Sequence, residues 1–294
     1  MTTTLRAATR ASPLARWQAE RVAELLRRID PSVTVELVVV DTQGDRQLDV
    51  PIWKLGGKGV FAKDVQAAVL DGRADMAVHS AKDLPSGTVP GLTLATVPER
   101  GDPRDALVGS TLADLPDGAE VATGSLRRQA QLAAARPDLR FVGLRGNMAT
   151  RIAKAAGHDA VVVAATALDR LGLADQIAER LRTDLVLPQV AQAALAVECR
   201  EDDAALLDLL RAIEDVDARR CVDVERAFLA ELGGDCSLPA AAYATVAGGV
   251  VSIEGRLAAV DGSTVLRHVG TDGASVARHL LDNGGHALLA NQRL

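Results

Sequence analysis

The sequence predicts an α/β protein with two similar α/β lobes and a smaller α+β domain at the C-terminus. Strand-like and helix-like segments alternate through most of the 294 residues, a pattern typical of parallel strands covered by helices. The turn-rich stretch 98–103 interrupts this alternation, which then restarts. From about residue 216 a long helix is followed by short alternating runs between glycine turns, which indicates antiparallel strands.

The first lobe is predicted to begin with a strand at residues 5–9. A helix follows from Ser12 to about Asp30, because Ser12 can cap the helix and Pro13 suits its first position. The next elements expected are a strand at 33–40, a helix at 60–71 and a strand at 75–79.

The second lobe is predicted to repeat this order of elements. Strands are expected at 120–123, 139–143 and 159–164, with helices at 125–136 and 147–156. A further crossing near 187–194 leads to helices, and the C-terminal strands are expected at 243–246, 250–257 and 263–269. Two similar lobes joined by a hinge near 98–103 predict a cleft between them.

Composition excludes several classes of protein. With 48% hydrophobic and 24% charged residues, the chain can bury a core and is not disordered. No stretch approaches the roughly 20 apolar residues of a membrane helix, and residues 1–10 lack a signal peptide's apolar run, so a cytoplasmic location is expected. A net charge of −6 and 2% aromatic residues argue against nucleic acid as a partner. An odd count of three cysteines without C-x-x-C spacing, and scattered histidines, give no reason to expect a metal.

Cations recur where strands lead into helices. Ser125 is the expected N-cap of a helix whose first turn contains Arg127 and Arg128, although cations are unfavourable at that end of a helix. The same arrangement is expected at Arg145 and Arg151 around the cap Asn147, at Arg10 before Ser12, and at Lys58 before the helix expected from Val60. Free N–H groups, a polar cap and a cation together predict anion sites. Carboxylates are favoured over a nucleotide triphosphate, because residues 55–59 lack the G-x-x-x-x-G-K-[ST] order.

Residues 78–85 (VHSAKDLP) form a second candidate site at the end of a predicted strand. Ser80 and Lys82 could bind an anion, and Asp83 could act as an acid-base or cation-stabilising carboxylate. A structural Asp83 that caps the following turn is the alternative. His79 and Ser80 are not expected to form a hydrolase pair, because adjacent strand residues point to opposite faces.

The cysteines differ in their sequence surroundings. Cys236 lies in the loop 232–239 (LGGDCSLP), which can present a thiol outside a core, while its reactivity stays open. Cys199 and Cys221 are expected to be ordinary helix residues.

An ordered set of motifs resembles the porphobilinogen deaminase family, also called hydroxymethylbilane synthases. The motifs are ATRASPLA at 8–15, LGGKGVF at 55–61, AVHSAKDLP at 77–85, DPRD at 102–105, SLRR at 125–128, LRGN at 144–147 and the Cys236 loop. The resemblance implies an enzyme of tetrapyrrole biosynthesis that condenses four porphobilinogen molecules head to tail with release of ammonia. Hydrolysis then releases the linear hydroxymethylbilane.

The resemblance also implies the residues of the site. Asp83 matches the catalytic aspartate, and Cys236 matches the cysteine that carries a dipyrromethane cofactor through a thioether. Cofactor-binding positions match Lys82, Asp83, Thr123, Ser125, Arg127, Arg128 and Arg145. Positions for the substrate or growing chain match Arg10, Ser12, Lys54, Lys58, Phe61, Ser80, Arg151 and Gln192. Phe61 could instead be an ordinary core aromatic.

The fold implied by the resemblance has three domains, the first two like periplasmic binding proteins. The expected domains are 1–98 with 194–212, then 102–188, and finally 216–294 with the cysteine loop. A monomer is expected.

The chain departs from the family pattern at a few positions. Gly124 replaces a hydroxyl residue of the anion site, and Asp235 beside Cys236 would raise the pKa of the thiol and slow attachment. Ala191 and Ala193 stand where glycines are usual, so either the turn differs or those glycines serve close packing. Two other functions stay open: a binding protein that captures an anionic metabolite without chemistry, and an inactive paralogue that acts through interactions.

Overall fold

The computed structural model describes residues 3–42, 59–233 and 238–290. Its contacts divide the chain into two compact units, the first containing Met1–Gly101 and Ala193–Arg220 and the second Asp102–Gln192 and Cys221–Leu294. Each unit is built around a five-stranded mixed sheet, and the second also carries a three-stranded antiparallel sheet. The α/β class with a smaller C-terminal sheet is therefore confirmed, while the three domain boundaries stay a prediction.

The sheet of unit 1 has the strand order β2-β1-β3-β10-β4. Its strands are β1 (Thr3–Arg10), β2 (Val33–Val40), β3 (Met76–Ser80), β4 (Leu92–Thr96) and β10 (Leu195–Arg200). Strand β1 is parallel to β2 and β3, whereas β10 is antiparallel to both β3 and β4. The helices are α1 (Pro13–Ile29), α3 (Lys63–Leu70) and α7 (Ala204–Arg211).

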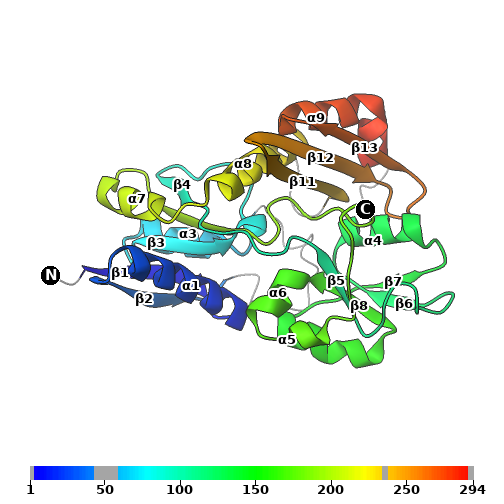
Figure 1. Ribbon diagram of the computed structural model, residues 1–294, viewed down its shortest axis with the longest axis horizontal. Helices are drawn as coiled ribbons and strands as arrows, with labels where there is room; N and C mark the ends of the chain where they lie inside the picture. The colour runs from blue at the N-terminus through cyan, green and yellow to red at the C-terminus, as the bar shows by residue number, and fades with distance from the viewer. Residues whose placement is uncertain (1–2, 43–58, 234–237, 291–294) are drawn as a thin grey trace. The chain divides into compact units, whose positions relative to one another are not determined.

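Helices cover both faces of this sheet (Figure 1). Ala7 packs in a cluster with Leu26 of α1 and Leu210 of α7, whereas its neighbour Ala8 packs with Val69 of α3. Successive strand residues point to opposite faces, so α1 and α7 lie on one face and α3 on the other. The apolar runs of these strands reflect burial on both faces.

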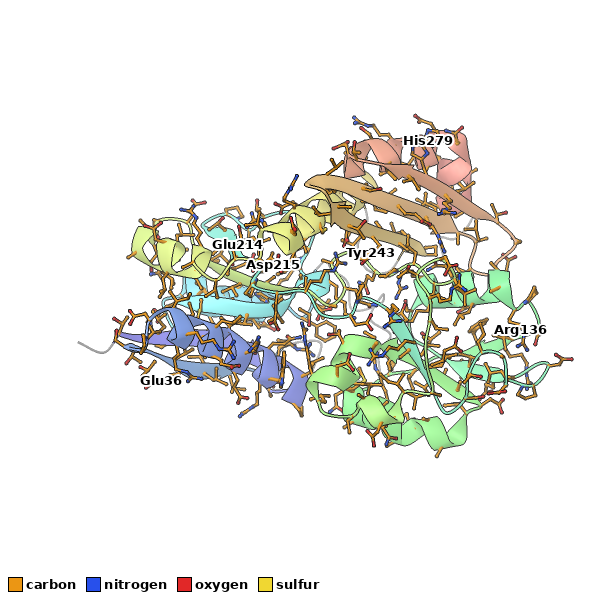
Figure 2. The ribbon with its side chains drawn as sticks, viewed as in Figure 1. Glu36, Arg136, Glu214, Asp215, Tyr243 and His279 are labelled. Carbon is orange, nitrogen blue, oxygen red and sulfur yellow. The ribbon has the colours of Figure 1, made fainter. Side chains whose placement is uncertain are left out.

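The large sheet of unit 2 repeats this arrangement in the order β7-β6-β8-β5-β9. Its strands are β5 (Asp105–Val108), β6 (Glu120–Ala122), β7 (Arg140–Val142), β8 (Ala160–Ala164) and β9 (Glu179–Arg180). Its helices are α4 (Leu126–Ala135), α5 (Met148–Ala153) and α6 (Ala165–Arg170), with short turns η3 (Lys154–Gly157) and η4 (Ala174–Gln176). Arg136, labelled in Figure 2, directly follows α4 and donates to the carbonyls of Leu112 and Leu115. These bonds join the C-terminal end of α4 to the segment 112–115.

The two large sheets share one topological feature. Each has a fourth strand antiparallel to its third, and that strand begins directly after the chain has passed from the other unit. In unit 2 this strand is β5, and in unit 1 it is β10. Both strands were missed by the sequence analysis, which expected helices after residue 194.

The C-terminal part of unit 2 follows the long helix α8 (Val216–Glu231). It contains β11 (Ala240–Ala247), β12 (Val250–Ala258), β13 (Val265–Gly270), α9 (Gly273–Leu280), the π-turn η5 (Leu281–Gly285) and α10 (His286–Ala290). Helix α9 packs on β12 and β13 (Figure 1). His279 of α9, labelled in Figure 2, stacks on His268 of β13 with 3.7 Å between ring centroids. Phe228 of α8 packs so closely that a Cβ added at Gly255 would lie 2.5 Å from its ring.

Two details of the predicted elements are wrong. Helix α3 begins at Lys63 rather than Val60, without a side-chain cap at Ala62. Cys199 lies in strand β10, not in a helix, whereas Cys221 is helical as expected. A short apolar run between polar residues fits a buried strand and a buried helix equally well, which explains the error at Cys199. Within the described residues, no helix is long and apolar enough to cross a membrane.

Candidate functional site

The candidate residues of unit 1 gather at the carboxyl edge of its sheet. Arg10 is the last residue of β1 and Ser80 the last of β3, and these strands are parallel neighbours. Lys82 and Asp83 follow in the short 3₁₀ turn η2 (Ala81–Asp83). Since parallel strands end at the same edge, the sheet brings these four side chains to one side of the unit.

Hydrogen bonds fix the turn that carries Asp83. Gln18 Nε2 of α1 donates to Ser80 Oγ at 2.7 Å, and Ala81 N donates to Ala194 O at 3.0 Å. The side chains of Lys82 and Asp83 are half-buried. No hydrogen bond to the Asp83 carboxylate is formed by any other described residue, so the alternative of a turn-capping role has no contact to support it.

Arg10 and Phe61 form a cation–π contact. The guanidinium carbon of Arg10 lies 4.1 Å from the centre of the Phe61 ring, and both residues are half-buried. Such a contact contributes about 0.5–1 kcal/mol at a partly exposed position. Phe61 is thus not a fully buried core aromatic. Ser12 Oγ caps α1 by accepting from Ala15 N at 3.3 Å, as its sequence position predicts.

A buried polar cluster lies on the opposite face of β3. Glu198 of β10 accepts a hydrogen bond from Gln66 Nε2 of α3 at 2.8 Å and lies 3.1 Å from His79 Nε2. Ser80, one residue later, bonds to α1 instead. His79 and Ser80 therefore point to opposite faces, which confirms that they form no hydrolase pair.

In unit 2 the predicted caps occupy the ends of neighbouring parallel strands. Ser125 Oγ accepts from Arg128 N at 3.4 Å at the start of α4, and Asn147 Oδ1 accepts from Thr150 N at 3.0 Å at the start of α5. Thr123 is buried after β6, and its Oγ1 accepts from Ser125 N at 3.2 Å. Both N-caps were correctly predicted, because capping depends on local sequence.

Asp105 is the centre of the site in unit 2. This fully buried carboxylate on β5 lies 2.7 Å from Arg127 Nη1 through Oδ2 and 2.8 Å from Arg128 Nη2 through Oδ1. Gln192 Nε2 also donates to Oδ1 at 2.9 Å. Burial opposes ionisation, but the two guanidinium charges outweigh it and hold the pKa of Asp105 well below its usual value. Asp105 is therefore charged at neutral pH.

Arg127 and Arg128 differ in how many donors they have used. All three nitrogens of Arg128 already donate, two to Asp105 and Nη1 to Val162 O at 3.3 Å. Arg127 uses Nη1 for Asp105 and for Leu187 O at 2.7 Å, whereas its Nε and Nη2 are buried without a partner in the described structure. Burial lowers the pKa of Arg127, partly offset by the Asp105 charge.

The balance of charge leaves this cluster positive. Two buried guanidinium groups share one carboxylate, and no second carboxylate contacts them within the residues that the structure describes. Unpaired donors in a buried position are unfavourable, so an additional anion beside Nε and Nη2 of Arg127 would be stabilising. A carboxylate suits these two nitrogens, because they lie on one side of the planar guanidinium fork.

The other candidate residues of unit 2 differ in burial and in their hydrogen-bond partners. Arg145 and Arg151 are half-buried, burial lowers the pKa of Arg145, and Arg151 Nε donates to Gly146 O at 2.9 Å. Gln192 is fully buried, and its Nε2 also donates to Pro103 O at 2.7 Å. The structure thus places Gln192 as a support for Asp105.

A small pocket adjoins Arg127. It is lined by Ser125, Arg127, Gln189, Val190, Leu229, Leu238 and Ala240. Leu238 follows Cys236 by two residues in the sequence. Cys236 itself, together with Asp235, Lys54 and Lys58, lies outside the described residues.

The turn at residues 191–193 keeps the conformation that favours glycine. Ala191 and Ala193 have φ of 57° and 73°, which costs about 1–2 kcal/mol for each residue with a side chain. Contacts hold them there: Ala191 N donates to Glu225 Oε2 at 2.6 Å, and Gly101 N donates to Ala193 O at 3.1 Å. Both alanines therefore adopt the left-handed conformation that glycine adopts readily, and they add local strain.

Gly124 allows a close approach of two backbone segments. A Cβ at this position would lie 2.7 Å from Leu144 O, although the φ of Gly124 is not positive. We expect Gly124→Ser to reduce the free energy of unfolding by about 1–3 kcal/mol, because the backbone must shift to admit the side chain. Chemical denaturation measures this change. Gly143→Ser, where nothing lies within 4 Å of the added Cβ, serves as the control and should change stability by less than about 0.5 kcal/mol.

Three buried carboxylates with structural roles were missed by the sequence analysis. Asp105 lies in the quoted DPRD motif but was given no role, and Glu198 was not singled out. Glu225 of α8 accepts from Ala191 N and from Ala244 N, the latter at 2.7 Å, and so joins the 191–193 turn to β11. The available signal was an acidic residue between apolar neighbours in the case of Glu198, and an acidic residue at the start of an apolar run in the case of Asp105.

Two family models and the curated relatives of this chain point to one family over nearly its full length. The family model for the dipyrromethane cofactor binding domain of porphobilinogen deaminase matches residues 5–208, and the model for the C-terminal domain of that enzyme matches residues 219–280. The porphobilinogen deaminase of Syntrophotalea carbinolica is 46% identical over 299 residues, covering 97% of this chain and 95% of that protein. That of Roseiflexus sp. strain RS-1 is also 46% identical, covering 99% of this chain and all of the relative. Among solved structures, the methionine-binding protein MetQ has a TM-score of 0.44 at 12% identity, covering 74% of this chain and 92% of that one.

Proposed function

The chain belongs to the porphobilinogen deaminase family, and we propose here how its residues divide the work of that enzyme. It is a transferase of tetrapyrrole biosynthesis that condenses four porphobilinogen molecules into hydroxymethylbilane, and its cofactor is dipyrromethane. The roles of individual residues below are proposals. The observation that carries them is the buried, net positive cluster of Asp105, Arg127 and Arg128 with two donors of Arg127 unused.

The cluster in unit 2 suits the cofactor. Each pyrrole of this pathway carries an acetate and a propionate, so a bound dipyrromethane brings carboxylates into the site. Arg127 Nε and Nη2 would accept one of them as a bidentate pair, and the carboxylate would balance the excess positive charge. Ser125, Thr123 and Arg145 lie at the same sheet edge and would hold the remaining polar groups, with the thioether at Cys236.

Arg128 has a different role in this proposal. Because its nitrogens already donate to Asp105 and Val162 O, it holds Asp105 and the start of α4 in place. Gln192 acts in the same way from the other side of Asp105. Both residues would position Arg127 rather than contact a ligand directly.

In unit 1 we assign the chemistry to the turn η2. When bound, dipyrromethane supplies the free pyrrole position to which the first substrate unit is joined. The half-buried carboxylate of Asp83 has no competing hydrogen bond among the described residues, so it can stabilise the positive charge that develops on the substrate pyrrole as ammonia leaves. The same carboxylate can accept the proton lost from the ring when the new bond forms.

The neighbouring cations would bind the substrate's acidic side chains. Lys82 and Arg10 lie at the same edge as Asp83, and Arg10 is oriented by its contact with the Phe61 ring. Ser80, Ser12 and Arg151 are proposed as further polar contacts, with Lys54 and Lys58 outside the described residues. We further propose that the protein is a cytoplasmic monomer that does not bind nucleic acid.

Intact-mass spectrometry tests this function most simply. Protein from a host that makes porphobilinogen should carry a mass increase equal to one dipyrromethane, and Cys236→Ser should abolish it. Cys199→Ser and Cys221→Ser are matched controls, because both thiols are buried and should leave the adduct unchanged. An unmodified wild-type chain would instead favour the binding-protein alternative.

A further inference from the structure

An arginine of the C-terminal sheet is buried against the layer that carries Arg127. Arg256 of β12 is 6% exposed, and its Nε donates to Glu254 Oε1 at 2.7 Å. Its Nη2 donates to Asp184 O at 2.9 Å and Thr183 O at 3.4 Å, and its Nη1 donates to Leu185 O at 3.3 Å. One guanidinium thus fixes three consecutive carbonyl groups of the segment 183–185.

The same guanidinium also reaches α4. Arg256 Nη1 donates to Gln131 Oε1 at 3.2 Å, and that oxygen accepts a second bond from Leu187 N at 2.8 Å. Gln131 Nε2 in turn donates to Leu187 O at 3.1 Å and to Arg127 O at 3.3 Å. Gln131 is buried, so it joins Arg256, Leu187 and Arg127 in one satisfied network.

The network ends on the side chain of Arg127. Leu187 O accepts both from Gln131 Nε2 and from Arg127 Nη1, the latter at 2.7 Å. The Leu187 carbonyl and Asp105 are the two groups that orient this guanidinium and leave its Nε and Nη2 unused. A shift of the segment 183–187 would therefore reorient Nε and Nη2 of Arg127, the two donors proposed to bind a carboxylate.

We propose that Arg256 is a positioning residue for the carboxylate site at Arg127. The proposal rests on the proposed role of Arg127 in cofactor binding. Arg256 donates to the carbonyls of 183–185 and to the side-chain amide oxygen of Gln131. These contacts fix the position of the Leu187 carbonyl, which in turn orients Arg127. The C-terminal domain would thus determine the geometry of the cofactor site as well as carry the attachment loop.

Loss of Arg256 should act on the attachment step. Without its donors, three carbonyls and the Gln131 oxygen lose a buried partner, and the segment can move to reach water. In metal sites, groups that orient a ligating side chain typically change affinity or activity by about 10–100-fold when removed, although they do not touch the ligand, and we expect an effect of this kind at Arg127. A purely structural Arg256 would lower stability without changing the attachment rate of the folded protein.

The test compares Arg256→Met with Arg267→Met in the full-length apoprotein. Arg267 lies on the adjacent strand β13 and pairs with the same Glu254, but it does not contact Gln131 or the segment 183–187. Apoprotein is made in a host that lacks porphobilinogen, and mass gain is followed after porphobilinogen is added, well below each variant's Tm. We expect Arg256→Met to slow covalent attachment about tenfold, and Arg267→Met to stay within about twofold of the wild type.

Two further variants make each outcome decisive. Arg256→Lys keeps the positive charge but can reach only some of these acceptors, because an ammonium lacks the planar fork, so it should recover part of the attachment rate even if Arg256→Met folds poorly. Arg127→Met should slow attachment at least as much as Arg256→Met. Normal attachment in a folded Arg256→Met protein, with slow attachment in Arg127→Met, would overturn the positioning role alone. Normal attachment in Arg127→Met would instead contradict the proposed function of the arginine cluster.

Discussion

Asp83→Asn is expected to reduce turnover of porphobilinogen by about 10²–10⁴-fold while the protein folds normally and still acquires its cofactor. The amide keeps the size of the side chain but provides neither a negative charge for the developing cation nor a site for the proton. Asp83 has no hydrogen-bond partner among the described residues, so its replacement should remove no structural contact. Steady-state release of ammonia and intact mass of the same sample measure the two properties together.

Asp71→Asn is the matched control for this prediction. Asp71 caps the C-terminal end of α3 in the same unit, away from the carboxyl edge of the sheet, and pairs with Arg73 at 3.3 Å on the surface. The control should retain turnover within about twofold, because an exposed ion pair contributes little. Wild-type turnover in Asp83→Asn would remove the catalytic role from this carboxylate.

Among the substitutions proposed here, Asp105→Asn is expected to reduce the free energy of unfolding the most. Removal of this charge leaves Arg127 and Arg128 buried together without a counter-ion, and breaking a buried pair in this way typically costs about 3–5 kcal/mol. The variant should also load cofactor poorly, because Asp105 orients Arg127. Urea unfolding measures the first effect, and the intact mass of freshly expressed protein measures the second.

A second substitution tests whether charge balance is the cause. Asp105→Asn combined with Arg128→Met should be less destabilised than the sum of the single changes, since one of the unbalanced cations is removed with the carboxylate. Strict additivity of the two changes would contradict a shared charge network. Arg182→Met is a suitable control, because its pair with Asp184 is exposed and should change stability by less than about 1 kcal/mol.

The pH dependence of stability tests whether the pKa of Asp105 is lowered in the folded protein. The pKa of Asp105 is lower in the folded state than in the unfolded state, where it is about 4. The charged carboxylate therefore contributes fully to the free energy of unfolding above about pH 4, and this contribution is lost as the pH falls toward the pKa of the folded state. Wild-type protein should therefore lose stability below about pH 4 more steeply than Asp105→Asn does. Equal slopes in that range would contradict the lowered pKa.

Local features of this fold could be predicted from the sequence, and the reason is physical. The caps Ser12, Ser125 and Asn147 each bond to an amide three residues away, so the information lies within one helical turn. The same holds for strand β2, whose bounds 33–40 agree with the structure. Arg10 lies at the end of its strand, and Ser125 and Asn147 begin the helices that follow theirs, whereas anion binding at these positions stays a prediction.

Long-range pairing explains what the sequence analysis missed. Arg127 and Arg128 looked equivalent in the SLRR motif, but adjacent helix residues point about 100° apart, and only contact with β5 and Leu187 distinguishes them. Asp105 reaches both arginines because β5 enters the sheet beside β8 after the chain leaves unit 1. No pattern within a short window reveals that insertion, nor the path from Arg256 to Gln131.

The central claim is that two nitrogens of Arg127 hold a carboxylate of the attached cofactor. A crystal structure of the holoprotein tests it most directly. We predict a carboxylate oxygen within about 3 Å of both Nε and Nη2 of Arg127, with Asp105 and Leu187 O still bound to Nη1. A structure in which the attached dipyrromethane leaves these two nitrogens without a carboxylate would contradict the account.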